Sequence, residues 1–137
     1  MSITNAVFSL SGYRFEKVMI DLSGLASSPQ AGIDINPSGS YREVDNTFNL
    51  KFNLSLRNDD KTFIAVECCA SFVFSGNVSF ADIPDYFYSN CIAIIFPYVR
   101  AFVSTITLQA NIGPVILPTF NLLGLSEELK KHTVVDE

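Results

Sequence analysis

The chain has 137 residues, 48% of them hydrophobic, and a formal net charge of −5 at pH 7. A chain of this length can form the hydrophobic core of one domain without disulfide bonds or a structural metal ion. Its apolar fraction is too high for a disordered protein. The acidic balance disfavours nucleic acid as a partner. We therefore expect a single domain over residues 1–137.

The cysteines and the N-terminus indicate the compartment. Cys68 and Cys69 are adjacent and Cys91 is the third, which is not the pattern of a disulfide framework. A reducing cytoplasm is the expected location. We expect no signal peptide, because no basic segment precedes an apolar run, and no membrane span, because no uninterrupted apolar run reaches about 18 residues.

Two strands are predicted in the first part of the chain. Residues Ala6 to Met19 alternate, but their apolar positions change face after Gly12, as they do at a β-bulge. Residues Gly32 to Asn36 predict a short strand, at an edge of the sheet, that Pro37 interrupts. Whether this strand resumes at Tyr41 is left open.

The middle of the chain predicts a β-hairpin. Thr47 to Arg57 alternates strictly, with Phe48, Leu50, Phe52, Leu54 and Leu56 on one face. Asn58-Asp59-Asp60 is a turn, and Thr62 to Phe74 is the partner strand. The second face of that partner strand is too apolar for a plainly solvated face, so we expect something to cover it, such as another subunit.

A long helix is predicted over about residues 84–111, with Asp82 as its N-cap. Pro97 lies inside this pattern and removes a helical hydrogen bond. We therefore expect a kink or a short break near Phe96, where two helical segments meet.

The remainder predicts an apolar loop and a short helix. Pro114 and Pro118 exclude regular helix or a central strand between them, although the side chains there are apolar. Ser126 can cap a short helix ending at Lys131, and Thr133 to Glu137 should fray. The fold class is α+β: a four-stranded antiparallel sheet over about residues 6–76, the kinked helix, and the loop and short helix in residues 112–137.

Catalytic chemistry is not supported. His132 is the single histidine and lies in the polar tail, so neither a zinc site nor a Ser-His-Asp or Cys-His arrangement is predicted. Glycine-rich nucleotide-binding motifs are absent. The three cysteines are interpreted as small buried hydrophobic residues. We expect neither an enzyme nor a cofactor or metal.

One stretch carries a resemblance to a known family. Cys91 is followed by Phe96-Pro97-Tyr98-Val99-Arg100 and then by the proline-bounded run Pro114 to Asn121. This arrangement resembles the SecB family of export chaperones, whose helix has the same Phe-Pro-Tyr-x-Arg core, followed by an apolar loop and a second helix. The matched motifs cover about a quarter of the chain, and the loop is about one residue shorter here.

The resemblance implies an ATP-independent holdase that is a cytoplasmic tetramer and keeps precursor proteins unfolded for export. On this reading the helix and the loop contact the client. The expected client-contact residues are Phe96, Tyr98, Val115, Ile116, Leu117 and Phe120. The expected structural residues are Pro97, Arg100, Pro114 and Pro118. Arg100 is expected to reach a carboxylate. The alternative for the loop is that its side chains only seal the core.

Partner docking is a further implication of the resemblance. In the family, acidic residues on the sheet bind the basic tail of the SecA motor. The corresponding candidates in this chain are Glu16, Asp21 and Glu67, although the basic Lys17 lies close to Glu16 in the sequence. Some relatives are instead dedicated to one client, such as an antitoxin. A hypothesis of another class is a small-ligand-binding or purely structural oligomeric domain with a pocket between sheet and loop.

Overall fold

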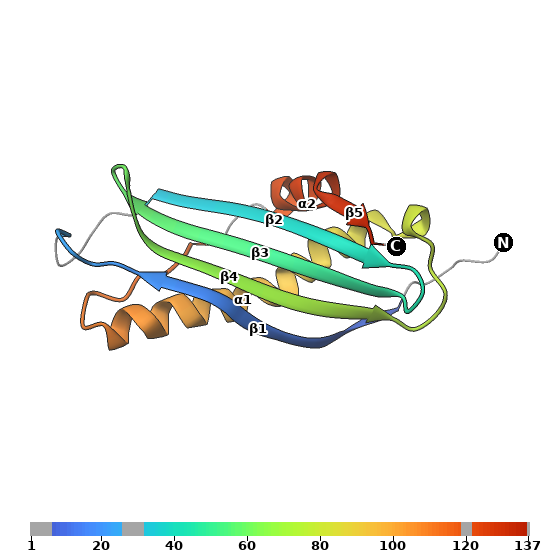
Figure 1. Ribbon diagram of the computed structural model, residues 1–137, viewed down its shortest axis with the longest axis horizontal. Helices are drawn as coiled ribbons and strands as arrows, with labels where there is room; N and C mark the ends of the chain where they lie inside the picture. Colours follow the sequence, from blue (N-terminus) through green and yellow to red (C-terminus); the bar gives the residue numbers. More distant parts are fainter. Residues whose placement is uncertain (1–6, 26–31, 119–121, 137) are drawn as a thin grey trace.

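A computed structural model describes residues 7–25, 32–118 and 122–136. Its elements are β1 (Phe8–Ile20), β2 (Gly32–Arg42), β3 (Thr47–Asn58), β4 (Lys61–Phe74), the 3-10 turn η1 (Phe80–Asp82), α1 (Asp85–Gln109), α2 (Leu122–Lys131) and β5 (Thr133–Val135). The strands form one mixed sheet in the order β1-β4-β3-β2-β5. Figure 1 shows α1 lying across one face of this sheet, whereas neither of the described helices covers the other face, here called the bare face.

The α+β prediction and the central hairpin are confirmed. The turn at Asp59 and Asp60 joins β3 to β4, and Asp59 adopts a positive φ of 54°. The alternating apolar face of β3 is almost completely buried. In β1 the register shifts between Leu10 and Gly12, which confirms the predicted bulge, and shifts again between Phe15 and Lys17.

Strand β2 is longer than predicted, because Pro37 does not end it. The N–H of Gly39 points away from β3 and donates to the carbonyl oxygen of His132 at 3.2 Å. Backbone groups of alternate residues point the same way, so the N–H that Pro37 lacks would face the outer edge of β2. Proline therefore costs no hydrogen bond to β3, and the strand runs on through Tyr41.

The C-terminal tail differs from the prediction in two ways. Helix α2 begins at Leu122 rather than at Ser126, and Thr133–Val135 pairs in parallel with Gly39 to Tyr41 instead of fraying. The N–H of Asp136 donates to the carbonyl oxygen of Tyr41 at 2.8 Å. The unpaired edge of β2 thus recruits a fifth strand that the local sequence does not announce.

Helix α1 is one uninterrupted helix, so no break occurs near Phe96, whereas the alternative of a kink at Pro97 stays a prediction. Pro97 and Ala93 both lie on the exposed side of α1, where water can satisfy the carbonyl oxygen of Ala93 that a proline leaves unbonded. The predicted N-cap is wrong: Pro84 occupies that position, and Asp82 belongs to η1.

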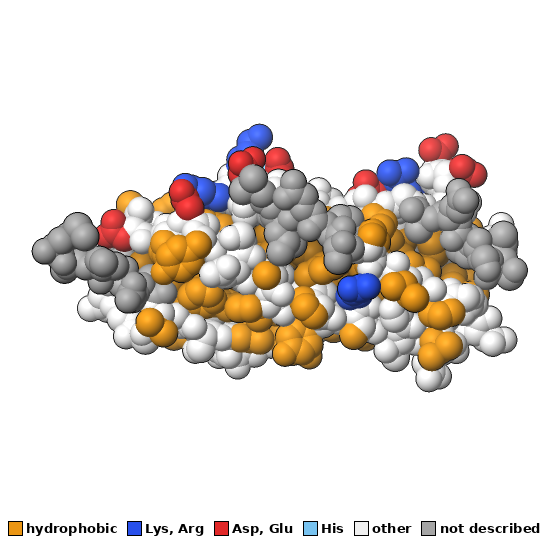
Figure 2. Space-filling model, turned by 180° about the vertical axis from the view of Figure 1, so that it is seen from behind, with side chains coloured by type: hydrophobic (Ala, Val, Ile, Leu, Met, Phe, Trp, Pro, Cys, Tyr) orange, Lys and Arg blue, Asp and Glu red, His pale blue; other side chains and the backbone are white. Residues whose placement is uncertain are grey.

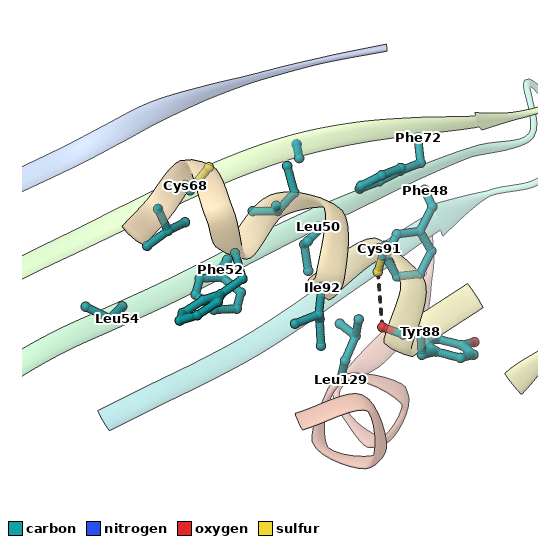
Figure 3. Close-up of a cluster of buried hydrophobic side chains, with 14 of the residues drawn as sticks. Phe48, Leu50, Phe52, Leu54, Cys68, Phe72, Tyr88, Cys91, Ile92 and Leu129 are labelled. Carbon is teal, nitrogen blue, oxygen red and sulfur yellow. Dashed lines mark hydrogen bonds between the residues drawn. The ribbon is translucent and has the colours of Figure 1, made fainter. Parts of the chain in front are cut away.

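The core lies between the sheet and the two helices. Figure 3 shows side chains of the β3 and β4 region facing Ile92 and Cys91 of α1, with Leu129 of α2 at the side. The ring of Phe87 lies 4.8 Å from Phe48 and 4.9 Å from Phe74, centroid to centroid. Aromatic contacts of this kind add to the free energy of area burial.

The cysteine prediction holds for two of the three residues. Cys68 and Cys91 are fully buried, and burial raises the pKa of the Cys68 thiol to about 11. Cys69 is only half-buried and faces away from α1, so its interpretation as a buried hydrophobic residue is wrong. It belongs to the bare face of the sheet, because neighbouring residues of a strand point to opposite sides.

Candidate functional site

The exposed side of α1 is unusual for a helix on a protein surface. The residues of this exposed line, here called the neutral stripe, are Tyr86, Asn90, Ala93, Ile94, Pro97, Tyr98, Ala101, Thr105 and Leu108. None of these residues carries a charge, and the exposed charge on α1 is confined to Asp85 in the first turn, although the solvent side of a surface helix is normally polar and charged. Figure 2 shows hydrophobic side chains spread over this side of the molecule, with many of the charged ones along one edge. Such a surface is typical of an interaction site.

Strand β1 extends the apolar surface beyond the helix. The ring of Tyr13 lies 4.5 Å from that of Tyr98, and Phe15 stacks on Phe102 of α1 at 3.9 Å. Val18 and Ile20 further along β1 are also exposed. Because β1 is the last strand on its side of the sheet, the apolar surface reaches a free strand edge.

The loop after α1 is fixed to the helix by two hydroxyl groups. The side-chain oxygen of Thr107 accepts the N–H of Val115 at 3.0 Å and donates to the carbonyl oxygen of Val103 at 2.9 Å. The hydroxyl of Ser104 donates to the carbonyl oxygen of Val115 at 3.1 Å. This clamp was not predicted from the sequence, where Val103 to Thr107 is notable only as a β-branched run unfavourable in a helix.

The clamp determines which loop side chains point outward. Val115 is half-buried, Ile116 is 68% exposed and Leu117 is fully buried in the core. Of the predicted contact residues on α1, Phe96 packs inward near Phe52 at 6.2 Å, whereas Tyr98 is exposed on the neutral stripe. Ile116 and Tyr98 are therefore exposed, and Phe96 and Leu117 are not. Phe120 lies outside the described residues.

Replacing Thr107 by valine should release the loop without changing the volume of the side chain. The N–H of Val115 would lose its acceptor, which costs about 1–2 kcal/mol for a partly buried donor. We expect lower stability in urea unfolding and faster hydrogen exchange of the Val115 amide. Thr105→Val is the matched control, because the exposed hydroxyl of Thr105 bonds only the carbonyl oxygen of Ala101 among the described residues. Equal effects of the two changes would contradict the clamp.

The predicted structural residues take different places. Pro97 lies on the neutral stripe, and Pro114 and Pro118 are exposed at either end of the loop segment Val115–Leu117. Arg100 is half-buried, and within the described ranges no ion pair includes its guanidinium group. Among the described residues, no carboxylate thus lies within ion-pair distance of Arg100.

Two of the three predicted docking carboxylates are already engaged. Glu16 accepts a hydrogen bond from Arg14 at 3.0 Å. Asp21 lies 3.4 Å from Lys61, and the Ser23 hydroxyl, then its N–H, and Lys61 hold the pKa of this carboxyl below its usual value. Glu67 lies opposite Lys17 in the pairing of β1 with β4. The bare face is therefore mixed in charge rather than acidic.

Neither a metal site nor a catalytic group emerges from the described residues. No cluster of three His, Cys, Asp or Glu residues among them could hold a metal ion. The ring nitrogen Nδ1 of His132 lies 2.9 Å from the carbonyl oxygen of Glu128, on the surface of the molecule. The arrangement therefore offers an apolar contact surface rather than reactive groups.

Helix α1 is long and apolar enough to cross a membrane. The sequence analysis predicted no such helix. Core helices of soluble proteins can have the same length and composition. The side of α1 formed by Phe87, Cys91, Ile95, Val99 and Val103 packs on the sheet. Packing on the sheet therefore accounts for the apolar character of this side of α1.

Comparison with known proteins gives a family match. The model of the family described as "Preprotein translocase subunit SecB" matches residues 14–132. A curated relative, "Uncharacterized protein MJ0357" of Methanocaldococcus jannaschii, is 56% identical over 46 residues, or 31% of this chain and 30% of the relative. The chain thus matches about a third of the length of that relative.

Two solved structures share the fold. The Mycobacterium tuberculosis Rv1957 SecB-like chaperone, in complex with a ChAD peptide from the Rv1956 HigA1 antitoxin, matches with a TM-score of 0.63 at 13% identity, over 83% of this chain and 91% of that one. A protein of unknown function from Streptococcus agalactiae matches with a TM-score of 0.51 at 11% identity, over 85% of this chain and 100% of that one. At these identities the likeness supports the fold alone.

Proposed function

Because this chain belongs to the SecB family and is a SecB-like chaperone without enzymatic activity, we propose that it is an ATP-independent holdase for unfolded polypeptides in the cytoplasm. A holdase acts by binding. A protein that binds the unfolded state of a client and not its folded state stabilises the unfolded state by RT ln(1 + [L]/Kd), where [L] is the concentration of free chaperone. The surface must therefore accept many sequences, which favours apolar contacts over specific charge pairs.

The neutral stripe, together with the exposed Ile116, is the observation that carries this proposal. Beyond Asp85 in its first turn, the exposed residues of this 25-residue helix carry no charge, and an apolar outer side of this kind is typical of a surface that binds a partner. The clamp at Thr107 holds Ile116 outward next to α1, so an extended apolar segment would meet a pre-formed wall rather than a loose loop. Pre-formed contacts lower the entropic cost of binding.

The proposed client site is the exposed part of the loop and the neighbouring helix. Ile116 and Tyr98 are its most exposed members, and half-buried Val115 forms its base. Phe96 and Leu117 would support the site from the core side rather than touch the client, and Phe120 remains a proposed contact. This division follows from the burial of each side chain in the single chain.

We also propose that the chain assembles into a homo-oligomer, most simply a tetramer built as a dimer of dimers. The neutral stripe and the free edge of β1 are the surfaces that such an assembly would cover. Apolar stripes along helices and unpaired strand edges are both surfaces that proteins avoid leaving in water. Tyr98 would then be covered together with the rest of the neutral stripe, so in the assembly the client would contact the loop at Ile116.

A dedicated client is the second candidate, favoured by the charge of the bare face. Delivery of precursors for export requires docking to SecA, which in the family uses acidic residues on the sheet. Here Arg14 and Lys61 already engage Glu16 and Asp21, and Lys17 lies opposite Glu67. A chaperone that serves one client, such as an antitoxin, would not need that docking site.

The test is protection of unrelated unfolded proteins from aggregation. The protein should suppress light scattering by two or more chemically denatured clients without ATP, at a stoichiometry near one assembly per client. A small-ligand-binding or purely structural domain should protect none. Protection of a single co-purified polypeptide, with no effect on the others, would favour the dedicated chaperone.

A further inference from the structure

A trough runs across the bare face of the sheet, opposite α1. Its volume is about 550 Å³, and it is open to solvent. Two rows of residues that pair across β1, β4, β3 and β2 line it. The first row is Gly12, Ser71, Asn49 and Ser40, and the second is Arg14, Cys69, Lys51 and Ser38.

Small side chains and bulged backbone produce the hollow. The wet face of a sheet is usually filled by long side chains, but most positions of these rows carry Gly, Ser, Cys or Asn. The register shift before Gly12 bends β1 at the same place, as a bulge does. The cross-strand hydrogen bond from the Ser71 hydroxyl to Asn49 Oδ1, 2.8 Å long, fixes the floor.

The lining of the trough carries one cation more than it carries carboxylates, because Arg14 and Lys51 face a single carboxylate, Glu16. Lys51 and Arg14 flank Cys69 on either side in the second row. The carboxylate among the lining residues is Glu16, and Arg14 already binds it at 3.0 Å. Since Ser71 uses the amide oxygen of Asn49, the amide NH₂ of Asn49 is left as a further donor. Donors and cations of this kind suit carboxylate oxygens.

We propose that this trough docks an acidic, extended segment of a partner polypeptide. Four strands at about 4.8 Å spacing make the trough about 14 Å long, which accommodates about four extended residues. A carboxylate side chain of the segment would lie at Lys51, between the two rows. The overall charge of −5 does not oppose this, because charges more than about 8 Å away are largely screened at physiological ionic strength.

The experiment uses three fluorescent eight-residue peptides in which serine alternates with glutamate, glutamine or lysine. Fluorescence anisotropy at low salt should give the tightest binding for the glutamate peptide, weakening as salt is added. Lys51→Glu should weaken that binding about tenfold or more, because it reverses an attraction at the site. Lys131→Glu, the same charge change at the exposed end of α2, should leave it unchanged.

Removal of a carboxylate near the trough should strengthen binding of the glutamate peptide, whereas Lys51→Glu should weaken it. Glu67→Gln, in the row next to the trough, should tighten binding of the glutamate peptide about two- to threefold if the site is anion-binding. The proposal is overturned if the glutamate peptide binds no tighter than the glutamine peptide or ignores Lys51→Glu. It is also overturned if the lysine peptide binds best and Glu67→Gln weakens it, because the face would then dock a basic tail.

The trough is independent of the proposed client site, which lies on the other side of the sheet. Lys51→Glu should therefore protect aggregating clients as well as the unchanged protein does. Loss of client protection in Lys51→Glu, with its fold intact by circular dichroism, would overturn this separation of the two sites. Failure of client protection in the unchanged protein would instead overturn the proposed function and leave peptide docking to be judged by anisotropy.

Discussion

A carboxylate at Ala101 should break the proposed tetramer into dimers that are held at the free edge of β1. Ala101 lies at the middle of the neutral stripe and is exposed in the single chain, so Ala101→Asp costs the fold little. Against a second copy the same carboxylate would be buried without a partner, and symmetry places it in the interface twice. We expect the dissociation constant to rise at least about a hundredfold, or about 2.7 kcal/mol.

Light scattering measures this directly, since the chain has a mass of 15.1 kDa and a tetramer has four times that mass. Val44→Asp is the control, because Val44 is an apolar residue, 87% exposed, in the turn between β2 and β3. It adds the same charge away from the stripe and should keep the full mass. An unchanged mass for Ala101→Asp, or a single-chain mass for the original protein, would show that the stripe is not an assembly surface.

The sequence-based prediction was most accurate for elements in which one fully buried face sets the spacing of the apolar residues. Strand β3 alternates strictly because α1 buries one side and water solvates the other, so its inward and outward positions follow from the residue pattern alone. β2 was predicted too short, because the effect of Pro37 depends on which way its missing N–H would point, and that depends on the neighbouring strands. β5 is three residues long and forms only because β2 has a free edge.

The candidate site was harder to predict because a loop has no period. Ile116 and Leu117 are adjacent and both apolar, yet one is exposed and the other is buried. What separates them is the hydrogen bonding of Val115 to Thr107 and Ser104, eight and eleven residues earlier in the chain. The proline-containing motif at Phe96 to Arg100 identified the family, but it did not indicate that Phe96 points inward and Tyr98 outward.

Leu117 and Ile116 should respond in opposite ways to substitution, because the clamp turns one inward and the other outward. Leu117 is fully buried, so Leu117→Ala should lower stability by about 2–5 kcal/mol. Ile116 is exposed, so Ile116→Ser should change stability by less than about 0.5 kcal/mol. Urea unfolding of the two variants measures this difference.

Client protection should separate the two variants in the reverse order. At a temperature where both are folded, Ile116→Ser should need several-fold more chaperone to suppress aggregation, because a polar group replaces apolar contact area. Folded Leu117→Ala should protect nearly as well as the original protein, since its side chain does not reach the surface. Full protection by Ile116→Ser would remove Ile116 from the client site and contradict the placement of that site at the loop.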